Sequence, residues 1–148
     1  MKIPSDVYET VLLMSHDLVT AAAIEDKQQE WRLYNELREY AESVAASGQD
    51  HPFLWETVAD FTSNDAAAIE IYLRALALAK ELHATDYLAS ICFALAERYS
   101  VLAAPETAYA FCEEANHYAK QTDDLALRRQ ISEFPLEQAH SDETFSHK

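Results

Sequence analysis

One pair of residues in the sequence has the spacing of a metal-ligand motif. Glu114 and His117 lie three positions apart, which on a helix places a carboxylate and an imidazole on one face, as di-iron bundles require. Such a site needs a second Glu-x-x-His pair and two further carboxylates, and the sequence contains one other such pair, Glu137 and His140, after Pro135. An exposed polar helix face is the simpler interpretation. The other histidines share no ligand spacing with one another: His16, His51, His83, His140 and His147.

The two cysteines are the remaining candidates for nucleophilic or metal-binding chemistry. Cys92 and Cys112 are too few for a disulfide scaffold, and both lie within helical patterns. A metal site needs more ligands, and a catalytic thiol needs a positive environment, whereas the chain has 26 acidic and 11 basic residues. We therefore expect both thiols to be reduced and buried as small apolar side chains.

Other catalytic patterns are not found in the sequence. No Ser-His-Asp order and no paired-carboxylate motif can be defended as a catalytic site, and a single glycine nearly excludes a phosphate-binding loop built from backbone amides. The sequence therefore predicts a non-enzymatic protein with no catalytic residue, no metal and no cofactor. A helical enzyme or metal carrier is the alternative.

The formal net charge of −15 limits the classes of partner. Phosphate backbones and anionic lipid would be repelled, so we expect neither a nucleic acid nor a membrane as partner. The first residues lack the apolar run of a signal peptide, and no segment reaches the roughly 18 apolar residues of a membrane span, which predicts a cytoplasmic protein. The acidic surface has two explanations, solubility or complementarity to a basic protein partner.

Composition and hydrophobic spacing predict an all-α fold. Helix formers dominate, and one glycine among 148 residues leaves little material for tight β-hairpins. Capping residues, prolines and apolar spacing predict seven helices, with Gly48 as a stop signal after the second. They run from a cap at Ser5 or Asp6 to about Ile24, from about Asp26 to Ala46, from Pro52 to near Thr62, from a cap at Asn64 or Asp65 to about Leu82, from a cap at Thr85 or Asp86 to Leu102, from Pro105 to about Ala119, and from a cap at Asp123 or Asp124 to Pro135. We expect a single domain over residues 1–138 and a polar, frayed tail over residues 139–148.

Apolar residues at helical spacing predict the faces that the first two helices bury. The first helix carries Val7, Val11, Met14, Leu18 and Val19. The second carries Trp31, Tyr34, Leu37, Tyr40, Ala41 and Val44.

Internal similarity relates the even-numbered helices. Two columns of residues recur with spacings of 38 and then 40 positions. They are Tyr34, Tyr72 and Cys112, and three residues later Leu37, Ala75 and Ala115. A period of about 40 residues is that of a helical hairpin.

The segment from Ala89 to Lys120 resembles a tetratricopeptide repeat. Leu95, Ala96 and Tyr99 stand where that family has its leucine, its small residue and its aromatic residue, and Ala108 and Ala115 take the next small positions. Three positions depart from the pattern: Cys92, Cys112 and Lys120 replace the family's tryptophan, large aromatic residue and proline. The fourth helix is similar to the second helix of such a repeat, through Ala68, Tyr72 and Ala75. The resemblance covers about residues 53–121 and implies an α-α superhelix, or solenoid, of about three hairpins with a C-terminal capping helix.

The resemblance also implies a binding site. In that family the first helix of each hairpin lines a concave groove. The corresponding positions are Phe53, Glu56 and Asp60 in the second repeat and Ser90, Phe93, Glu97 and Ser100 in the third. Exposed phenylalanine beside Glu and Asp would make the groove apolar and acidic. The alternative is that Phe53 and Phe93 complete the core.

These observations lead to one functional hypothesis with two variants. We expect a protein–protein interaction module that binds a basic or amphipathic polypeptide. One variant is an immunity or antitoxin protein that neutralises a cationic toxin, because such a partner needs acidic complementarity and fast association. The other is a chaperone or adaptor for a secreted or regulatory protein. The oligomeric state and the choice between concave and convex faces stay open.

Overall fold

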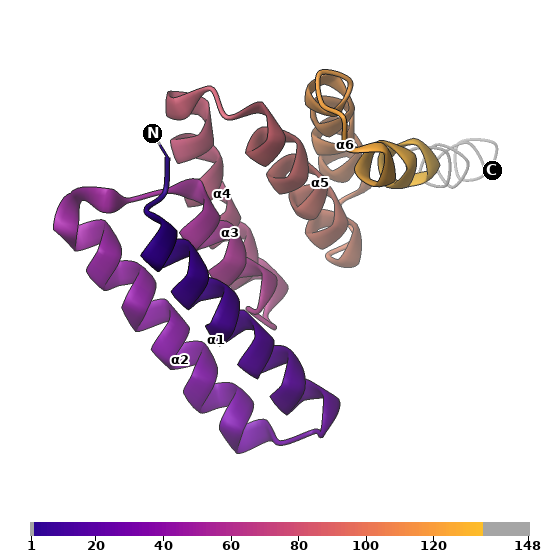
Figure 1. Cartoon of the computed structure of the whole chain (residues 1–148). Coiled ribbons are helices and arrows are strands. Elements are labelled where there is room, and N and C mark those ends of the chain that lie inside the picture. The colour runs from indigo at the N-terminus through magenta and orange to yellow at the C-terminus, as the bar shows by residue number, and fades with distance from the viewer. Residues whose placement is uncertain (1, 135–148) are drawn as a thin grey trace. The chain divides into compact units, whose positions relative to one another are not determined.

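A computed structural model describes residues 2–134 of the chain, and these residues form helices and turns with no strand (Figure 1). The all-α fold class predicted from the sequence is therefore confirmed. The elements are α1 (Ser5–Ala23), α2 (Lys27–Val44), the π-helical turn η1 (Ala45–Gln49), α3 (Pro52–Asp60), α4 (Asp65–Leu82), α5 (Thr85–Val101), α6 (Pro105–Ala119) and a further helical segment over residues 125–134. The predicted break at Pro135 and the predicted tail over residues 139–148 lie outside the described residues.

The chain divides into two compact units. The first unit is Met1–Leu78 and the second begins at Ala79, so the division falls within α4. Within the described residues, no helix combines the length and the apolar character that crossing a membrane requires.

Side-chain caps begin four of the described helices. At the start of α3, the His51 ring nitrogen accepts a hydrogen bond from the Phe53 backbone nitrogen at 3.0 Å. The Asp26 carboxylate accepts a hydrogen bond from the Gln29 backbone nitrogen at 3.1 Å at the start of α2. Two of the predicted caps are confirmed, because Asn64 accepts from the nitrogen of Ala67 at 2.9 Å and Asp124 accepts from that of Leu127 at 3.0 Å.

The predicted caps of the first and fifth helices are wrong. Pro4 and Ala84 occupy the cap positions and form no side-chain hydrogen bond there. Their carbonyl oxygens accept the first helical hydrogen bonds, from the nitrogens of Tyr8 and Leu88 at 3.0 and 2.9 Å. The polar residues that follow are therefore already inside the first turn, where a side chain cannot act as the cap.

Three helices end on a residue other than glycine in the left-handed region. Glu25, His83 and Ala103 have φ values of 57°, 51° and 58°. In each case the backbone nitrogen of the next residue donates a hydrogen bond to the carbonyl oxygen five positions earlier. For example, the nitrogen of Ala104 donates to the Tyr99 carbonyl at 3.0 Å. This geometry satisfies the last carbonyls of a helix and reverses the chain within two or three residues. Gly48, with φ of 89°, follows α2 as the predicted stop signal.

In the first unit, α1 and α2 form an antiparallel pair against which α3 packs. The fully buried side chains at this contact include Val11, Leu37, Leu54 and Val58. The hydroxyls of Tyr34 and Thr62 are 2.6 Å apart, and Thr62 also donates to the Val58 carbonyl at 2.8 Å. These contacts place the middle of α2 opposite the C-terminal end of α3.

A polar cluster joins the loop before α3 to α4 within the first unit. One Asp50 oxygen accepts hydrogen bonds from the Trp55 indole nitrogen at 2.6 Å and from the His51 backbone nitrogen at 3.0 Å. Its other oxygen lies 3.6 Å from an Arg74 nitrogen, and the Arg74 guanidinium lies 3.5 Å from the centre of the Trp55 ring. A charged side chain therefore satisfies the buried indole, and α3 is fixed to α4 on this side.

In the second unit, α5 and α6 pack closely through small side chains. Ala96, Ala108 and Ala115 are fully buried, as is the Cys112 thiol. Small residues let two helix backbones approach closely, which explains why alanines occupy these positions. Ile131 of the segment 125–134 is also fully buried, and the Cys112 sulfur lies 3.8 Å from its carbonyl oxygen.

Two residues that the spacing placed in the core of the first unit are exposed. Trp31 lies one turn before Tyr34 on α2, beyond the end of α3, so no helix of the first unit covers it there. Val19 of α1 is also exposed, because the buried face of α1 is formed by other residues. They are Val7, Val11, Leu18 and Ala21.

Candidate functional site

The three positions predicted on the second repeat lie on one face of α3. Phe53, Glu56 and Asp60 are spaced by three and then four residues, which is one turn per step. Phe53 is half-buried, and its ring centre lies 4.9 Å from that of Tyr8 on α1. Glu56 is half-buried, while Asp60 is exposed and accepts a hydrogen bond from the Tyr72 hydroxyl. Phe53 therefore connects this face of α3 to α1.

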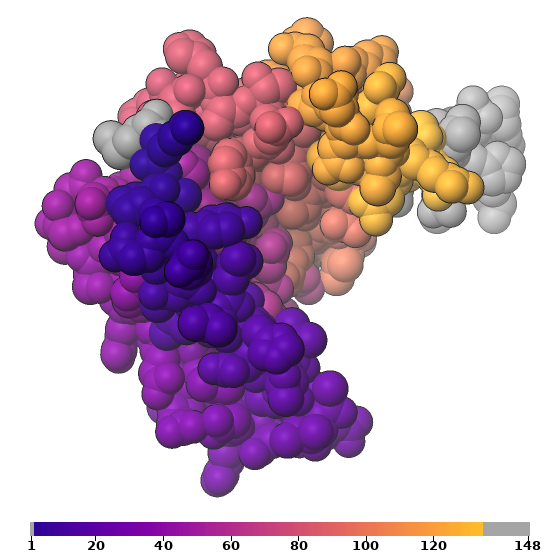
Figure 2. Space-filling model, viewed as in Figure 1, coloured from indigo at the N-terminus to yellow at the C-terminus, as the bar shows by residue number. Residues whose placement is uncertain are grey.

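An exposed apolar stripe on α1 extends this surface. Tyr8, Leu12 and Val19 lie at positions i, i+4 and i+11 of α1 and are all exposed. These spacings place the three side chains along one side of the helix. We call them the α1 stripe. Figure 2 shows the outer side of α1, in indigo, uncovered along much of its length.

Sequence reasoning missed the α1 stripe, although a signal for it exists. One buried face of a helix takes apolar residues at spacings of three and four. The sequence of α1 has more apolar residues than one face can hold, which indicates a second apolar face.

Apart from His16, the charged side chains of α1 are all acidic. Asp6, Glu9 and Asp17 are exposed, and α1 contains no Lys or Arg. Helical spacing places Glu9 beside the α1 stripe, whereas Asp6 and Asp17 lie on the opposite side of α1. The α1 stripe and Glu9, together with Phe53, Glu56 and Asp60, form a surface of the first unit that we call the acidic–apolar surface.

The positions predicted on the third repeat lie on α5, so the seven predicted residues are divided between the two units. Glu97 is exposed, and Ser90 and Ser100 are half-buried. The expected exposure of Phe93 is wrong. Phe93 is buried and makes an edge contact with Phe134, their ring centres 5.7 Å apart, because the segment 125–134 packs over this part of α5. Phe93 therefore completes the core, as the alternative interpretation held.

The two cysteines are buried and free of disulfide bonds. Burial raises the pKa of Cys92 from 9.0 to about 12, with a smaller contribution from Glu114. Burial also raises the pKa of Cys112, to about 11, with Glu113 adding to the effect. A nucleophilic thiol needs a lowered pKa, so both environments oppose thiolate formation.

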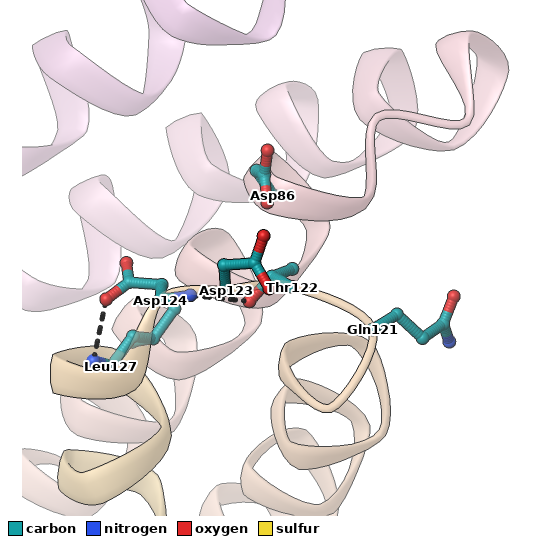
Figure 3. Close-up of a pocket in the computed structure, with 6 residues that line it drawn as sticks. All are labelled: Asp86, Gln121, Thr122, Asp123, Asp124 and Leu127. Atoms are coloured by element: carbon teal, nitrogen blue, oxygen red, sulfur yellow. Dashed lines mark hydrogen bonds between the residues drawn. The ribbon is translucent and has the colours of Figure 1, made fainter.

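The remaining polar clusters do not assemble a metal site. Glu114 and His117 are both exposed on α6, and among residues 2–134 no group of three or more His, Cys, Asp or Glu side chains could hold a metal ion. A hollow of about 480 Å³ in the second unit contains Asp86, Asp123 and Asp124 (Figure 3). Asp124 is engaged there as a helix cap, so this acidity serves the fold.

A second hollow, of about 470 Å³, lies on the first turns of α2. It is lined by Lys27, Gln28, Trp31 and Arg32. Both cations have local partners, since Lys27 lies 3.7 Å from Glu30 and Arg32 donates to the Gln29 side chain at 2.6 Å. This hollow is open and carries no cluster of reactive groups.

Comparison of this chain with protein-family models, with curated proteins and with solved structures finds no match.

Proposed function

We propose that this chain is a non-enzymatic protein-binding module of the tetratricopeptide-repeat kind, which holds a basic or amphipathic polypeptide on its acidic–apolar surface. The observation that carries the proposal is the α1 stripe, which leaves three large apolar side chains uncovered beside carboxylates. Exposed apolar side chains that form a contiguous group and are bordered by charge are typical of protein interaction sites.

The packing supports the repeat assignment. In such a repeat, small residues are needed where paired helices approach, and Ala96, Ala108 and Ala115 are all fully buried. The packing also supports the internal similarity between the even-numbered helices. Leu37, Ala75 and Ala115, which form one of the two recurring columns, are all fully buried. The hairpins would then present their first helices, α1 and α3, on one side for binding.

The electrostatics support a basic partner. The net charge of −15 attracts cations from a distance, and carboxylates along α1 and α3 would fix the partner's orientation at contact. Binding of this kind needs no turnover, and the high pKa values of Cys92 and Cys112 offer no activated nucleophile.

Two biological variants of this function follow from different observations. The large negative charge favours an immunity or antitoxin protein that neutralises a cationic toxin. The uncovered α1 stripe favours a chaperone or adaptor, which would cover an apolar segment of a secreted or regulatory protein. In either variant we expect the protein to act in the cytoplasm.

The test begins with the partner that co-purifies with the chain from its native host. Its association rate is then compared between the parent and a variant in which Glu9→Gln, Glu56→Gln and Asp60→Asn remove three charges from the acidic–apolar surface. The matched control removes three exposed charges from α2, with Glu36→Gln, Glu39→Gln and Glu42→Gln.

We expect the first variant to associate more slowly by about tenfold at low salt, with little change in the control, because steering depends on charge near the contact. Circular dichroism checks that both variants are folded. Equal slowing in both variants would mean that only net charge matters. An unchanged rate in both would reject the acidic–apolar surface as the site.

A further inference from the structure

The α1 stripe has the spacing of a seam between two helices. Tyr8, Leu12, Ser15 and Val19 follow one another at steps of four, three and four residues. This is the alternation with which one helix packs along another. At about 1.5 Å per residue, the stripe spans about 16 Å, or three helical turns.

Ser15 does not interrupt the apolar character of this seam. Its hydroxyl donates to the Val11 carbonyl at 2.8 Å within α1, so burial beneath a partner would leave no unsatisfied hydroxyl proton. Its small side chain also leaves room between Leu12 and Val19 for a large side chain of an approaching helix.

The described residues offer no site for strand addition by an extended peptide. Strand addition needs a sheet edge, and residues 2–134 contain no strand to offer one. A helix satisfies its own backbone hydrogen bonds and so requires only the side-chain complementarity that the α1 stripe provides.

Charge decides between a second copy of this chain and a foreign helix. Glu9 lies beside the seam and α1 has no Lys or Arg to pair with it, so a second copy of α1 would offer no cation. Two chains of −15 would also repel each other at a distance. A helix with Lys or Arg beside its apolar stripe would instead pair with the Glu9 carboxylate.

We propose that the segment held on the α1 stripe is a basic amphipathic helix of another protein, at least three turns long. The Leu12 and Val19 side chains pack between its apolar residues, Tyr8 and Phe53 contact one end of it, and Glu9 faces its cations. This inference rests on the function proposed above and specifies the chemistry of the bound segment.

The test uses synthetic peptides and the whole chain. The probe is a labelled 19-residue peptide of Leu, Ala and Lys, with Leu at alternating steps of three and four residues and Lys beside them. One comparison peptide has the same composition in scrambled order, so that its leucines do not share a face. A second carries a central Pro, and a third replaces Lys by Glu. Fluorescence anisotropy measures each Kd.

Matched protein variants locate the contact. Leu12→Gln with Val19→Gln changes side chains that are 45% and 57% exposed, so the fold should tolerate both changes. Leu102→Gln with Val101→Gln is the control in the second unit, where the same two residue types are 47% and 68% exposed. Circular dichroism and sedimentation report folding and self-association.

We expect the amphipathic Lys peptide to bind at least about tenfold more tightly than each comparison peptide, and the Leu12 and Val19 changes to remove about that factor. The control variant should bind like the parent. Equal binding of the scrambled or Pro peptide would overturn the helical occupant while leaving a basic partner in place. Equal binding of the Glu peptide would overturn the basic character.

Two further results would also contradict the inference. The first is a dimer of the parent that Leu12→Gln dissociates, which would make a second copy the occupant. The second is failure of all four peptides to bind. The function itself is tested separately by the host partner and the charge variants, so it can survive either result.

Discussion

Replacing Asp50 by Ala should be among the most destabilising changes of a partly exposed residue in the first unit. The Asp50 carboxylate accepts hydrogen bonds from the Trp55 indole at 2.6 Å and from the His51 backbone nitrogen at 3.0 Å. Trp55 is 2% exposed, so water cannot readily replace the lost acceptor. An unpaired buried donor costs about 1–3 kcal/mol, and the second lost bond adds to it, which gives about 2–4 kcal/mol in total.

The ion pair with Arg74 contributes much less to this figure. The Asp50 and Arg74 side chains are 31% and 48% exposed, and a pair this accessible to water contributes about 0.2–1 kcal/mol. The stacking of Arg74 on Trp55 adds about 0.5–1 kcal/mol at such a site. We therefore expect Arg74→Ala to cost about 1 kcal/mol. Asp50→Asn keeps an oxygen acceptor for the indole and should cost about the same.

Urea unfolding followed by tryptophan fluorescence measures these differences. A Trp31→Phe background makes Trp55 the only tryptophan, and Trp31 is exposed, so its replacement should leave the first unit intact. The expected order of destabilisation places Asp50→Ala well above Asp50→Asn and Arg74→Ala. If Asp50→Ala costs no more than Arg74→Ala, the hydrogen bond to the buried indole is not the main contribution, and the reasoning is refuted.

Three further predictions concern the second unit. Ala96→Phe should overpack the seam between α5 and α6 and lower the free energy of unfolding by about 1–3 kcal/mol. The control, Ala110→Phe on the exposed side of α6, should have little effect. Equal melting temperatures for the two variants would show that Ala96 does not lie at a close contact. Cys92→Ala with Cys112→Ala should lower stability modestly and leave partner binding intact, so loss of binding by a folded double variant would contradict a packing role. The folded state holds both thiol protons more tightly than the unfolded state does, so the contribution of the thiols to stability should be complete below pH 9.0 and decline as the pH rises toward about 12. A parent and a double variant with the same pH dependence in that range would disprove this.

Local signals in the sequence were sufficient for most helix boundaries. Pro52 and Pro105 begin helices as expected, and Asn64 and Asp124 cap helices. Where the cap predictions failed, at Pro4 and Ala84, the cap position was held by backbone conformation without a side-chain hydrogen bond. A polar residue near a helix start is not enough to identify the cap, because the residue with non-helical backbone must coincide with it.

The candidate site was only partly predictable. The spacing of Phe53, Glu56 and Asp60 was sufficient to place them on one face of α3. Their continuation onto α1 depends on the contact of Phe53 with Tyr8, two residues 45 positions apart in the sequence. Phe93 was misassigned because its exposure depends on a helix that follows in the chain and packs over it through Phe134.

The amino-acid sequence by itself determined the helical class and the elements, because both follow from spacing and capping over a few residues. The resemblance to a tetratricopeptide repeat predicted the small residues at the seam between α5 and α6. The tertiary structure alone decided which apolar faces are covered. Helix α1 has two such faces: one is buried against α2 and α3, while the α1 stripe stays exposed although its Tyr8 touches Phe53 of α3. Trp31 has core spacing, yet α3 ends before reaching it. Burial depends on the length and position of neighbouring helices, and periodicity within one helix has no information about either.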